Sequence, residues 1–359
     1  MRNIIDINSE WILSTEKKEE GTSVHKRILP LYKEDDYAYY LEFLSAAPVI
    51  EISLNGEKIA VHNGSFTIFR VDVTDKIVNG DNELDVCCTG DCPAVVANLI
   101  LVESTHFSLD HYGDAGMLVQ PSEVMASSAS VKLRAYTNCV PEDAMISYTV
   151  LTTTGTMLAN KSVPASSPEY VCHLSNPNLW QGKASPALYV AVAAFISSGR
   201  IVDQIVLPFG LRTVTTDARD HLAVNGSPVP EKEVLRTTET DPYFYDDMDA
   251  AGTFLCADLT PLCNKCTDTA DCELQIREFV LQHSYHPSIL CWKLPTDAAD
   301  LANVIRGRSV STGVIIVVKL IKNVSNRMHA SRTLYCHVLP LPVPSTPLSR
   351  LSSRPGLQS

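Results

Sequence analysis

The hydrophobic and polar positions of the chain follow two different periods, and the change between them falls near Thr215. Before this point, apolar residues alternate with polar ones in short runs, a pattern that predicts half-buried β-strands. After it, apolar residues recur at helical spacing between short, continuous apolar runs. The pattern therefore predicts an all-β part followed by a part in which helices alternate with buried strands.

The strongest strand signal in the first part is a β-hairpin. Residues 49–54 alternate between apolar and polar, Asn55 and Gly56 can adopt the two positive φ angles of a tight turn, and the alternation resumes at Ile59. A further strand, with a bulge, is predicted over residues 66–73. Short strands at close spacing are typical of a β-sandwich.

A second stretch of about 100 residues, which ends near residue 214, repeats this pattern. Its last long strand is predicted from four alternating apolar residues, Leu188, Val190, Val192 and Ala194. The Ser198-Gly199 turn then leads into a partner strand. Length and pattern together predict an immunoglobulin-like β-sandwich.

The part after residue 215 is predicted to contain helices. Asp241 can cap the free amide groups of a helix that starts at Pro242, and Gly252 can end that helix. A second, amphipathic helix is predicted over residues 271–282. Buried strands are predicted at 254–257 and 289–292. Helices that alternate with short apolar strands indicate βα units and a parallel sheet.

Composition and net charge exclude several classes of protein. With 359 residues, 45% of them hydrophobic and 19% charged, the chain has enough apolar material for roughly two or three packed domains. A net charge of −12 opposes contact with a phosphate backbone, so no nucleic acid partner is expected. No apolar run approaches the roughly 18 residues that span a bilayer, so no membrane association is expected. The N-terminus shows no secretory signal, which predicts a cytoplasmic location and 11 reduced cysteines.

The charges are distributed unevenly along the chain. Residues 301–359 contain eight Lys or Arg and no Asp or Glu, so they carry +8 and the first 300 residues carry −20 (−12 − 8). This composition break predicts a boundary at Asp300. From Leu339 onward the chain is rich in Pro and Ser without periodicity, which predicts a disordered tail.

Five stretches, in order, resemble glycoside hydrolase family 2, the family of β-galactosidases and β-glucuronidases. They begin at Ser53, Asn176, Asp220, Arg236 and Arg277 and read SLNGEKIAVHNGSFTIFRVDVTDKIVNGDNELDV, NPNLWQGKASPALYVAVAAFISSGRIVDQIVLPFGLRTV, DHLAVNGSPV, RTTETDPYFYDDMDAAGTFLCAD and REFVLQHSYHPSILCWKLPTD. The fourth is similar to the β-galactosidase branch in particular. The resemblance covers roughly residues 30 to 297 and implies hydrolysis of O-glycosyl bonds in carbohydrate metabolism.

The resemblance implies a multidomain fold of β and α/β parts. Its expected units are a sugar-binding-like jelly-roll β-sandwich at 1–110, an immunoglobulin-like β-sandwich at 111–215, an incomplete (β/α)8 TIM-barrel piece at 216–300, an uncertain basic segment at 301–338 and the tail at 339–359. The DHLAVNGSPV stretch resembles the first barrel strand. About ten residues separate it from the next strand, fewer than a crossover helix needs, so we expect the first helix to be deleted.

The family's chemistry uses two carboxyl groups about 5 Å apart, an acid/base and a nucleophile. Asp297 stands at the position of the family's acid/base glutamate, and Thr296 replaces an asparagine that contacts the sugar. Trp292 and Asp258 are the other expected substrate-binding residues. No position for the nucleophile is found among residues 301–359, which carry no carboxylate side chain. We therefore expect a catalytically impaired chain.

Cysteine and histidine positions were weighed as metal ligands. Cys263, Cys266 and Cys272 could suggest zinc, but a structural zinc site requires four ligands. These residues, like Cys87, Cys88 and Cys92, are interpreted as free thiols, and His286 as a structural residue. No metal and no cofactor are expected.

Three hypotheses for the function follow. The first is a β-galactosidase-like hydrolase by descent. The second is a non-catalytic remnant whose two sandwiches bind carbohydrate or a protein partner. The third is a truncated or mis-joined gene product with a foreign basic tail. In the second and third, open edges of the barrel piece predict oligomers and a weakly held or locally unfolded part after residue 216.

Overall fold

A computed structural model describes residues 2–14, 21–45, 49–64, 67–90, 92, 94–109, 116–216, 221–239, 241–264, 266 and 268–294, together with the backbone of two strands at 315–319 and 333–336. Four sequence predictions fall outside these residues: the roles of Thr296 and Asp297, the start of a strand at Phe66, and the tail at 339–359. The basic segment is described only as the two strands, β23 (Ile315–Lys319) and β24 (Thr333–Cys336).

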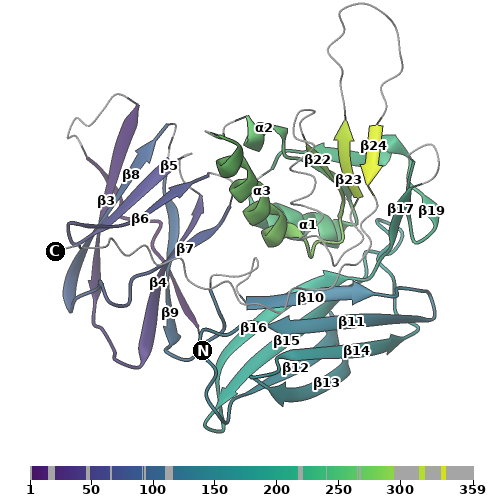
Figure 1. Cartoon of the computed structure of the whole chain (residues 1–359), viewed down its shortest axis with the longest axis horizontal. Helices are drawn as coiled ribbons and strands as arrows, with labels where there is room; N and C mark the ends of the chain where they lie inside the picture. The colour runs from purple at the N-terminus through teal and green to yellow at the C-terminus, as the bar shows by residue number, and fades with distance from the viewer. Residues whose placement is uncertain are drawn as a thin grey trace, which may run out of the picture.

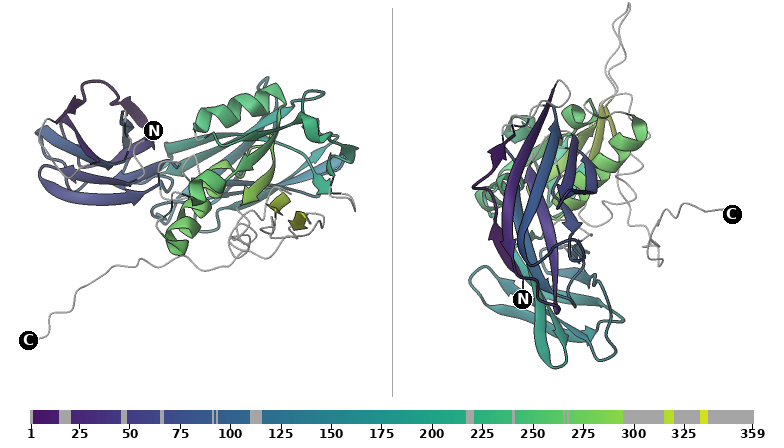
Figure 2. Two further views of the ribbon diagram at one scale, coloured as in Figure 1. Left: turned by 90° about the horizontal axis from the view of Figure 1, so that it is seen from above. Right: turned by 90° about the vertical axis from the view of Figure 1, so that its left-hand side faces the viewer.

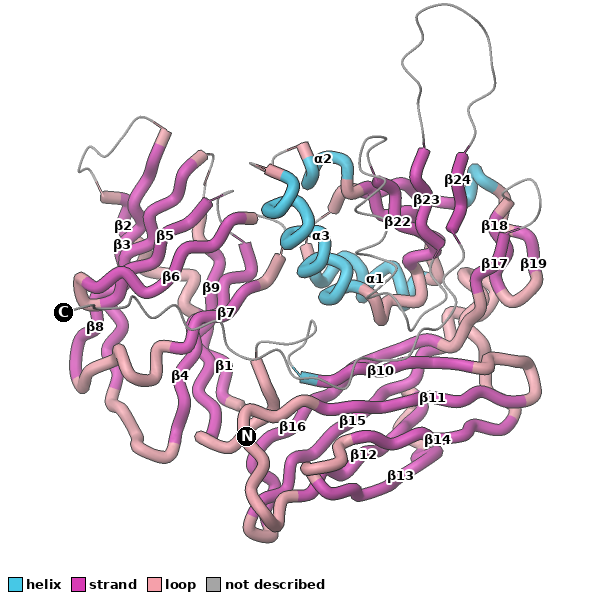
Figure 3. Tube along the Cα trace, viewed as in Figure 1, coloured by secondary structure: helices cyan, strands magenta, loops and turns pink. Residues whose placement is uncertain are grey.

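The described chain is mostly β-structure and forms three parts (Figure 1). The first sandwich lies at one end of the long axis (Figure 2), and the second lies below the third part in the view of Figure 1. The α-helices are clustered in the third part (Figure 3). None of the helices in the described ranges is long and apolar enough to cross a membrane.

The first sandwich packs a five-stranded sheet, in the order β2-β3-β8-β5-β6, against a four-stranded sheet, β1-β9-β4-β7. The strands are β1 (Asn3–Asp6), β2 (Ile12–Leu13), β3 (Thr22–Leu31), β4 (Tyr37–Ser45), β5 (Val49–Leu54), β6 (Glu57–Asn63), β7 (Phe69–Asp72), β8 (Gly80–Thr89) and β9 (Val96–Glu103). Both sheets supply the core, with Ile52 and Val86 from one and Leu41 and Leu99 from the other.

The predicted hairpin is confirmed. Strands β5 and β6 pair antiparallel, and Asn55 and Gly56 have φ angles of 54° and 79° at the turn. These left-handed angles suit the two-residue turns that match the twist of paired strands. The strand predicted over residues 66–73 is shorter, because β7 covers only Phe69–Asp72.

The second sandwich packs the sheet β10-β11-β14 against the sheet β13-β12-β15-β16. Its strands are β10 (Met117–Ser122), β11 (Ser128–Ala135), β12 (Met145–Thr152), β13 (Met157–Pro164), β14 (Glu169–Ser175), β15 (Leu188–Ser197) and β16 (Arg200–Gly210). Leu133 of one sheet and Tyr148 of the other are both fully buried in the shared core. The predicted turn at Ser198-Gly199 joins β15 to β16, with φ angles of 51° and 74°.

The strand predicted from Leu188, Val190, Val192 and Ala194 is confirmed, but these residues are not the ones that fill the core. The buried face of β15 carries Tyr189, Ala191, Ala193 and Phe195. Both faces of this strand are apolar, so a period of two does not distinguish the inner face from the outer one. The cross-sheet partners, which lie far away in sequence, decide it.

The third part contains the sheet β20-β21-β22-β23-β24, in which the first four strands run parallel and β24 runs antiparallel. Its elements are β20 (Val234–Thr237), α1 (Pro242–Ala251), β21 (Phe254–Asp258), α2 (Thr260–Cys263), α3 (Thr269–His283) and β22 (Ile289–Leu294), preceded by the 3-10 turn η2 (Glu231–Glu233). The predicted helix start is confirmed, because the Asp241 side chain accepts a hydrogen bond from the amide of Tyr243. Gly252 ends this helix with φ 67°, as predicted. The short helix α2 was not predicted.

The expectation that residues 222–224 form the first parallel barrel strand is wrong. This segment is β18 (Leu222–Val224), and it pairs antiparallel with β17 (Val214–Thr216) and β19 (Ser227–Pro228). The Asn225-Gly226 turn, with two positive φ angles, produces this pairing. No α-helix lies between β18 and β20 in the described residues 221–239, where only η2 occurs. The parallel sheet starts at β20.

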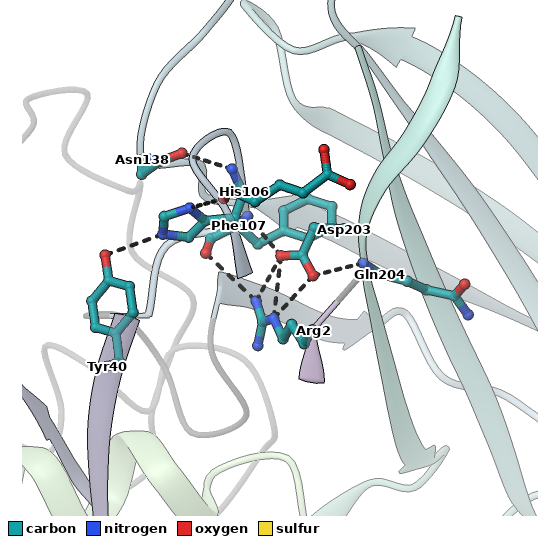
Figure 4. A network of polar contacts seen from close by, with 8 residues as sticks. Arg2, Tyr40, His106, Phe107, Asn138, Asp203 and Gln204 are labelled. Carbon is teal, nitrogen blue, oxygen red and sulfur yellow. Dashed lines mark hydrogen bonds and ion pairs between the residues drawn. The ribbon is translucent and has the colours of Figure 1, made fainter. Parts of the chain in front are cut away.

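A part-buried ion pair joins Arg2, near the N-terminus, to the second sandwich (Figure 4). Arg2 Nε lies 3.0 Å from Oδ1 of Asp203 on β16, whose side chain is fully buried. The same carboxylate accepts a hydrogen bond from the amide of Phe107, at 2.9 Å. Beside it, Tyr40 on β4 bonds to His106 at 3.1 Å, so the connection after β9 is held from both sandwiches.

Helix α3 is bonded to the first sandwich. The Glu278 carboxylate accepts a hydrogen bond from the Thr67 hydroxyl at 2.9 Å and lies 3.3 Å from His62 Nε2. The Gln282 side-chain oxygen accepts from the amide of Ile68 at 2.9 Å. These contacts hold α3 to the first sandwich in the structure, and the expectation of a locally unfolded or weakly held segment after residue 216 stays a prediction.

Candidate functional site

The carboxyl ends of β20, β21 and β22 form the edge of the sheet where parallel α/β folds place their ligand sites. Asp258 ends β21 and stands in register with Lys293 of β22. Lys293 donates a hydrogen bond to the Asp258 carboxylate and forms an ion pair with it. The amide of Thr260 donates to the same carboxylate at 3.0 Å. One predicted site residue is thus paired within the protein. We call this group of residues the carboxyl-edge site.

The environment of Asp258 stabilises its ionised form. Burial acting by itself would raise its pKa, but the hydrogen bonds from Lys293 and Thr260 outweigh burial and lower the pKa below 3.8. Asp258 is therefore a carboxylate at neutral pH. A carboxylate that is held this way can orient a neighbour, but it has no proton to donate.

The pocket at this edge is small. It is lined by the ends of β20 and β21 and by side chains of α1, α2 and α3, namely Thr237, Thr238, Glu239, Tyr245, Ala257, Asp258, Leu259, Pro261, Leu262 and Phe279. Its interior has room for about one water molecule. A sugar ring does not fit into that space without a movement of the lining residues.

Trp292 lies beside this pocket but faces the core. Its side chain is fully buried and packs edge-on against Phe279 of α3, with 6.1 Å between ring centroids. Successive residues of a strand point to opposite faces, so Trp292 and Lys293 lie on different sides of β22. Contact between Trp292 and a sugar remains a prediction. Thr296 and Asp297 lie beyond the last described residue of β22, and their roles also remain predictions.

Sequence reasoning did not assign a role to two residues of the carboxyl-edge site. Lys293 is half-buried against Asp258, and Glu239 lies two residues after the end of β20 and lines the pocket. The backbone carbonyl of Glu239 accepts a hydrogen bond from the Tyr245 hydroxyl at 2.9 Å. The sequence signal for Lys293 is its charge, opposite to that of Asp258, but the two can be matched only when the strand register is known.

A buried network supports the start of β22. Oδ2 of Asp249 on α1 lies 2.7 Å from His286 Nδ1, and Oδ1 accepts from the amide of Ser288 at 2.9 Å. The indole of Trp180, from the second sandwich, donates to the backbone carbonyl of Asp249 at 3.0 Å. The structural role predicted for His286, at the entrance of the strand, is confirmed.

Arg212 holds the same segment from the other side. It is buried and donates hydrogen bonds to the backbone carbonyls of His286, Pro287 and Ile289. Burial lowers the pKa of Arg212 to about 10, and the nearby charge of Asp249 opposes this shift. The guanidinium therefore stays protonated at neutral pH and fixes the chain that leads into β22.

Two pairs of thiols lie near the carboxyl-edge site. Cys256 and Cys291 face each other across β21 and β22, and their mutual hydrogen bond lowers the pKa of Cys256 and raises that of Cys291. Burial raises the pKa of Cys266 to about 12 and that of Cys263 still further. All ten cysteines whose side chains the structure describes are thiols rather than halves of disulfides.

Two clusters in the described residues have the side chains and spacing of metal ligands. One consists of Asp246, Asp249 and His286, and the other of His25, Cys88 and Cys92. Neither includes a residue of the carboxyl-edge site. The first cluster is already bonded internally through the contact between Asp249 and His286.

The second sandwich matches a known family model. Residues 113–212 match the model of glycosyl hydrolases family 2. A β-glucuronidase of Bacteroides fragilis is 22% identical over 222 residues, which cover 55% of this chain and 32% of that protein.

Solved structures share the fold over most of the chain. An FMN-binding β-glucuronidase from Faecalibacterium prausnitzii L2-6 superposes with a TM-score of 0.73 at 22% identity, over 85% of this chain and 61% of that one. A Bifidobacterium dentium β-glucuronidase complexed with coumarin-3-O-glucuronide gives a TM-score of 0.73 at 14% identity, over 88% of this chain and 74% of that one. The matched part of this chain corresponds to about a third of the length of the Bacteroides fragilis β-glucuronidase. The family model thus matches the second sandwich, less than a third of this chain, and the solved structures show a shared fold; neither specifies a β-galactosidase or β-glucuronidase branch.

Proposed function

We propose that this chain is a glycosyl hydrolases family 2 protein that by itself has little or no glycosidase activity and acts through carbohydrate binding. The observation that carries the proposal is the ion pair between Asp258 and Lys293 at the carboxyl-edge site. A retaining glycosidase needs a carboxylic acid that protonates the leaving group and a carboxylate that attacks the sugar. Asp258 is ionised, so it cannot act as the acid, and the hydrogen bonds from Lys293 and Thr260 to its two oxygens oppose an attack on a sugar.

The space at the carboxyl-edge site supports the same proposal. The pocket has room for about one water molecule, and the aromatic residue expected beside the sugar, Trp292, is fully buried. The two proteins of known structure described above are β-glucuronidases by name, and one of them is complexed with a glucuronide. A carbohydrate with a β-linked galactose or glucuronate is therefore the ligand class we propose for this chain.

We also propose a domain division and a barrel origin for the third part. The units are 1–110, 111–215 and 216–300; the first core lies within 1–110, and the second core lies within 111–215 apart from Phe107, which supports this division. Strands β20, β21 and β22 run parallel with helices in their crossovers, which is the repeating unit of a (β/α)8 barrel. Strand β20 pairs only with β21 among the described strands, so it offers an open edge for a second chain.

The test is hydrolysis of an aryl β-galactoside and an aryl β-glucuronide by the purified full chain. We expect no turnover that depends on Asp297, so the wild type and Asp297→Ala should give the same background rate. Binding of galactose and glucuronate is measured in parallel by NMR line broadening. Turnover that Asp297→Ala abolishes would contradict the loss of activity, and absence of binding to either sugar would contradict the carbohydrate role.

A further inference from the structure

A cluster of zinc-type ligands lies at the rim of the first sandwich. His25 on β3, Cys88 on β8 and Cys92 in the connection between β8 and β9 place their ligand atoms within 4.8 Å of one another. They come together because β3 and β8 pair antiparallel, with Ser23 opposite Cys88 and His25 opposite Val86. Val86 and Cys88 are two residues apart on β8, so their side chains share one face of the sheet. His25 lies opposite Val86 and therefore shares that face with Cys88.

The connection after β8 brings in the third ligand. The amide of Gly90 donates to the carbonyl of Gly21 at 2.9 Å, which closes the end of the β3 and β8 ladder. The chain then turns toward the other sheet, and Cys92 packs against the core of the sandwich. The cluster therefore sits where the chain crosses between the two sheets.

Burial makes this a protected site with one accessible side. His25 is 7% exposed and Cys88 is fully buried, whereas Cys92 is half-buried. A half-buried third ligand leaves a path by which an ion can enter.

The imidazole of His25 is oriented by its neighbours. Its Nε2 lies 3.3 Å from the Ser23 hydroxyl, and the ring also forms a hydrogen bond with the backbone of Cys92. Zinc would replace one of these two contacts at a ring nitrogen, and the other would continue to hold the ring, as a backbone or side-chain group does for most metal-binding histidines.

We propose that His25, Cys88 and Cys92 bind a Zn²⁺ ion, with water as the fourth ligand. Zinc takes thiolate sulfur at about 2.3 Å and imidazole nitrogen at about 2.0 Å in tetrahedral geometry, which places the ligand atoms about 3.5 to 3.8 Å apart. The ligand atoms now lie within 4.8 Å of one another, so the ion would draw them closer together. Binding removes the protons of both thiols and releases them to solvent. The ion would link the connection between β8 and β9 to β3.

The test is a metal titration of the full chain purified under reducing conditions and stripped with a chelator. We expect about one Zn²⁺ per chain after dialysis, measured by plasma mass spectrometry, and a rise in Tm with added Zn²⁺. Co²⁺ serves as the spectroscopic probe, because thiolate ligands give it an intense charge-transfer absorption. Cys88→Ser and Cys92→Ser should each weaken Zn²⁺ binding by about 10-fold or more.

Cys87→Ser is the matched control. Cys87 is the neighbour of Cys88 on β8, pairs with Val24 and points to the opposite face, so its loss should leave the Co²⁺ absorption and the Zn²⁺-dependent rise in Tm unchanged. Three results would overturn the proposal. They are Zn²⁺ content near zero after dialysis, equal losses in Cys87→Ser and Cys88→Ser, or a Cys88 to Cys92 disulfide in peptide maps of the isolated protein.

Discussion

Single residues decide how closely the second sandwich and the third part approach each other. Gly252 has φ 67°, and a Cβ atom there would lie 2.4 Å from the backbone carbon of Gly182. Gly226 has a similar φ of 79° but open space around it. Gly226→Ala should therefore cost about 1 kcal/mol of unfolding free energy from backbone strain, whereas Gly252→Ala should cost at least about twice that, because strain and a backbone clash add. Urea unfolding of both variants measures the difference. Equal losses of unfolding free energy in the two variants would show that the close approach of Gly252 to Gly182 adds no cost.

The unit formed by α3 and β22 contains a pH-sensitive element. His283 is buried, and burial, followed by the nearby His286, lowers its pKa well below 6.5. The unfolded chain then binds a proton more readily than the folded one, so the stabilisation is complete above pH 6.5 and is lost as the pH falls toward the lower folded-state pKa. His283→Gln should flatten the decline of urea stability between pH 7.5 and pH 5.5, and His173→Gln, on the exposed face of β14, should leave it unchanged. A decline as steep in His283→Gln as in the wild type would contradict this assignment.

The whole molecule is held together by buried hydrogen bonds between its three parts. Arg212 of the second sandwich binds three backbone carbonyls that lead into β22. A lysine ammonium does not offer this planar set of donors. Arg212→Lys should therefore lower the free energy of unfolding by about 2 kcal/mol and speed hydrogen exchange of the β22 amides. The control is Arg200→Lys, because the exposed pair of Arg200 with Glu103 contributes little. Unchanged exchange in β22 would show that the third part folds independently of Arg212.

The sequence by itself determined the local elements. The Asn55-Gly56 turn, the helix start at Asp241 and the helix end at Gly252 were all predictable, because they depend on the backbone preferences of a few adjacent residues. The ordered stretches also indicated a resemblance to glycoside hydrolase family 2 over most of the chain, and the family model matches residues 113–212. The sequence predicted that Asp258 belongs to a site, but it did not predict that Lys293 neutralises the carboxylate.

Tertiary structure decided which residues meet. The inner face of β15, the burial of Trp292 and the pairing of Asp258 with Lys293 depend on strand register and on packing partners far away in the chain. The same holds for the rim cluster, because His25 is brought to Cys88 by strand pairing and no spacing in the sequence reveals it. The physical reason is that periodicity records local conformation, whereas contacts between distant residues form only when sheets close and cores exclude water.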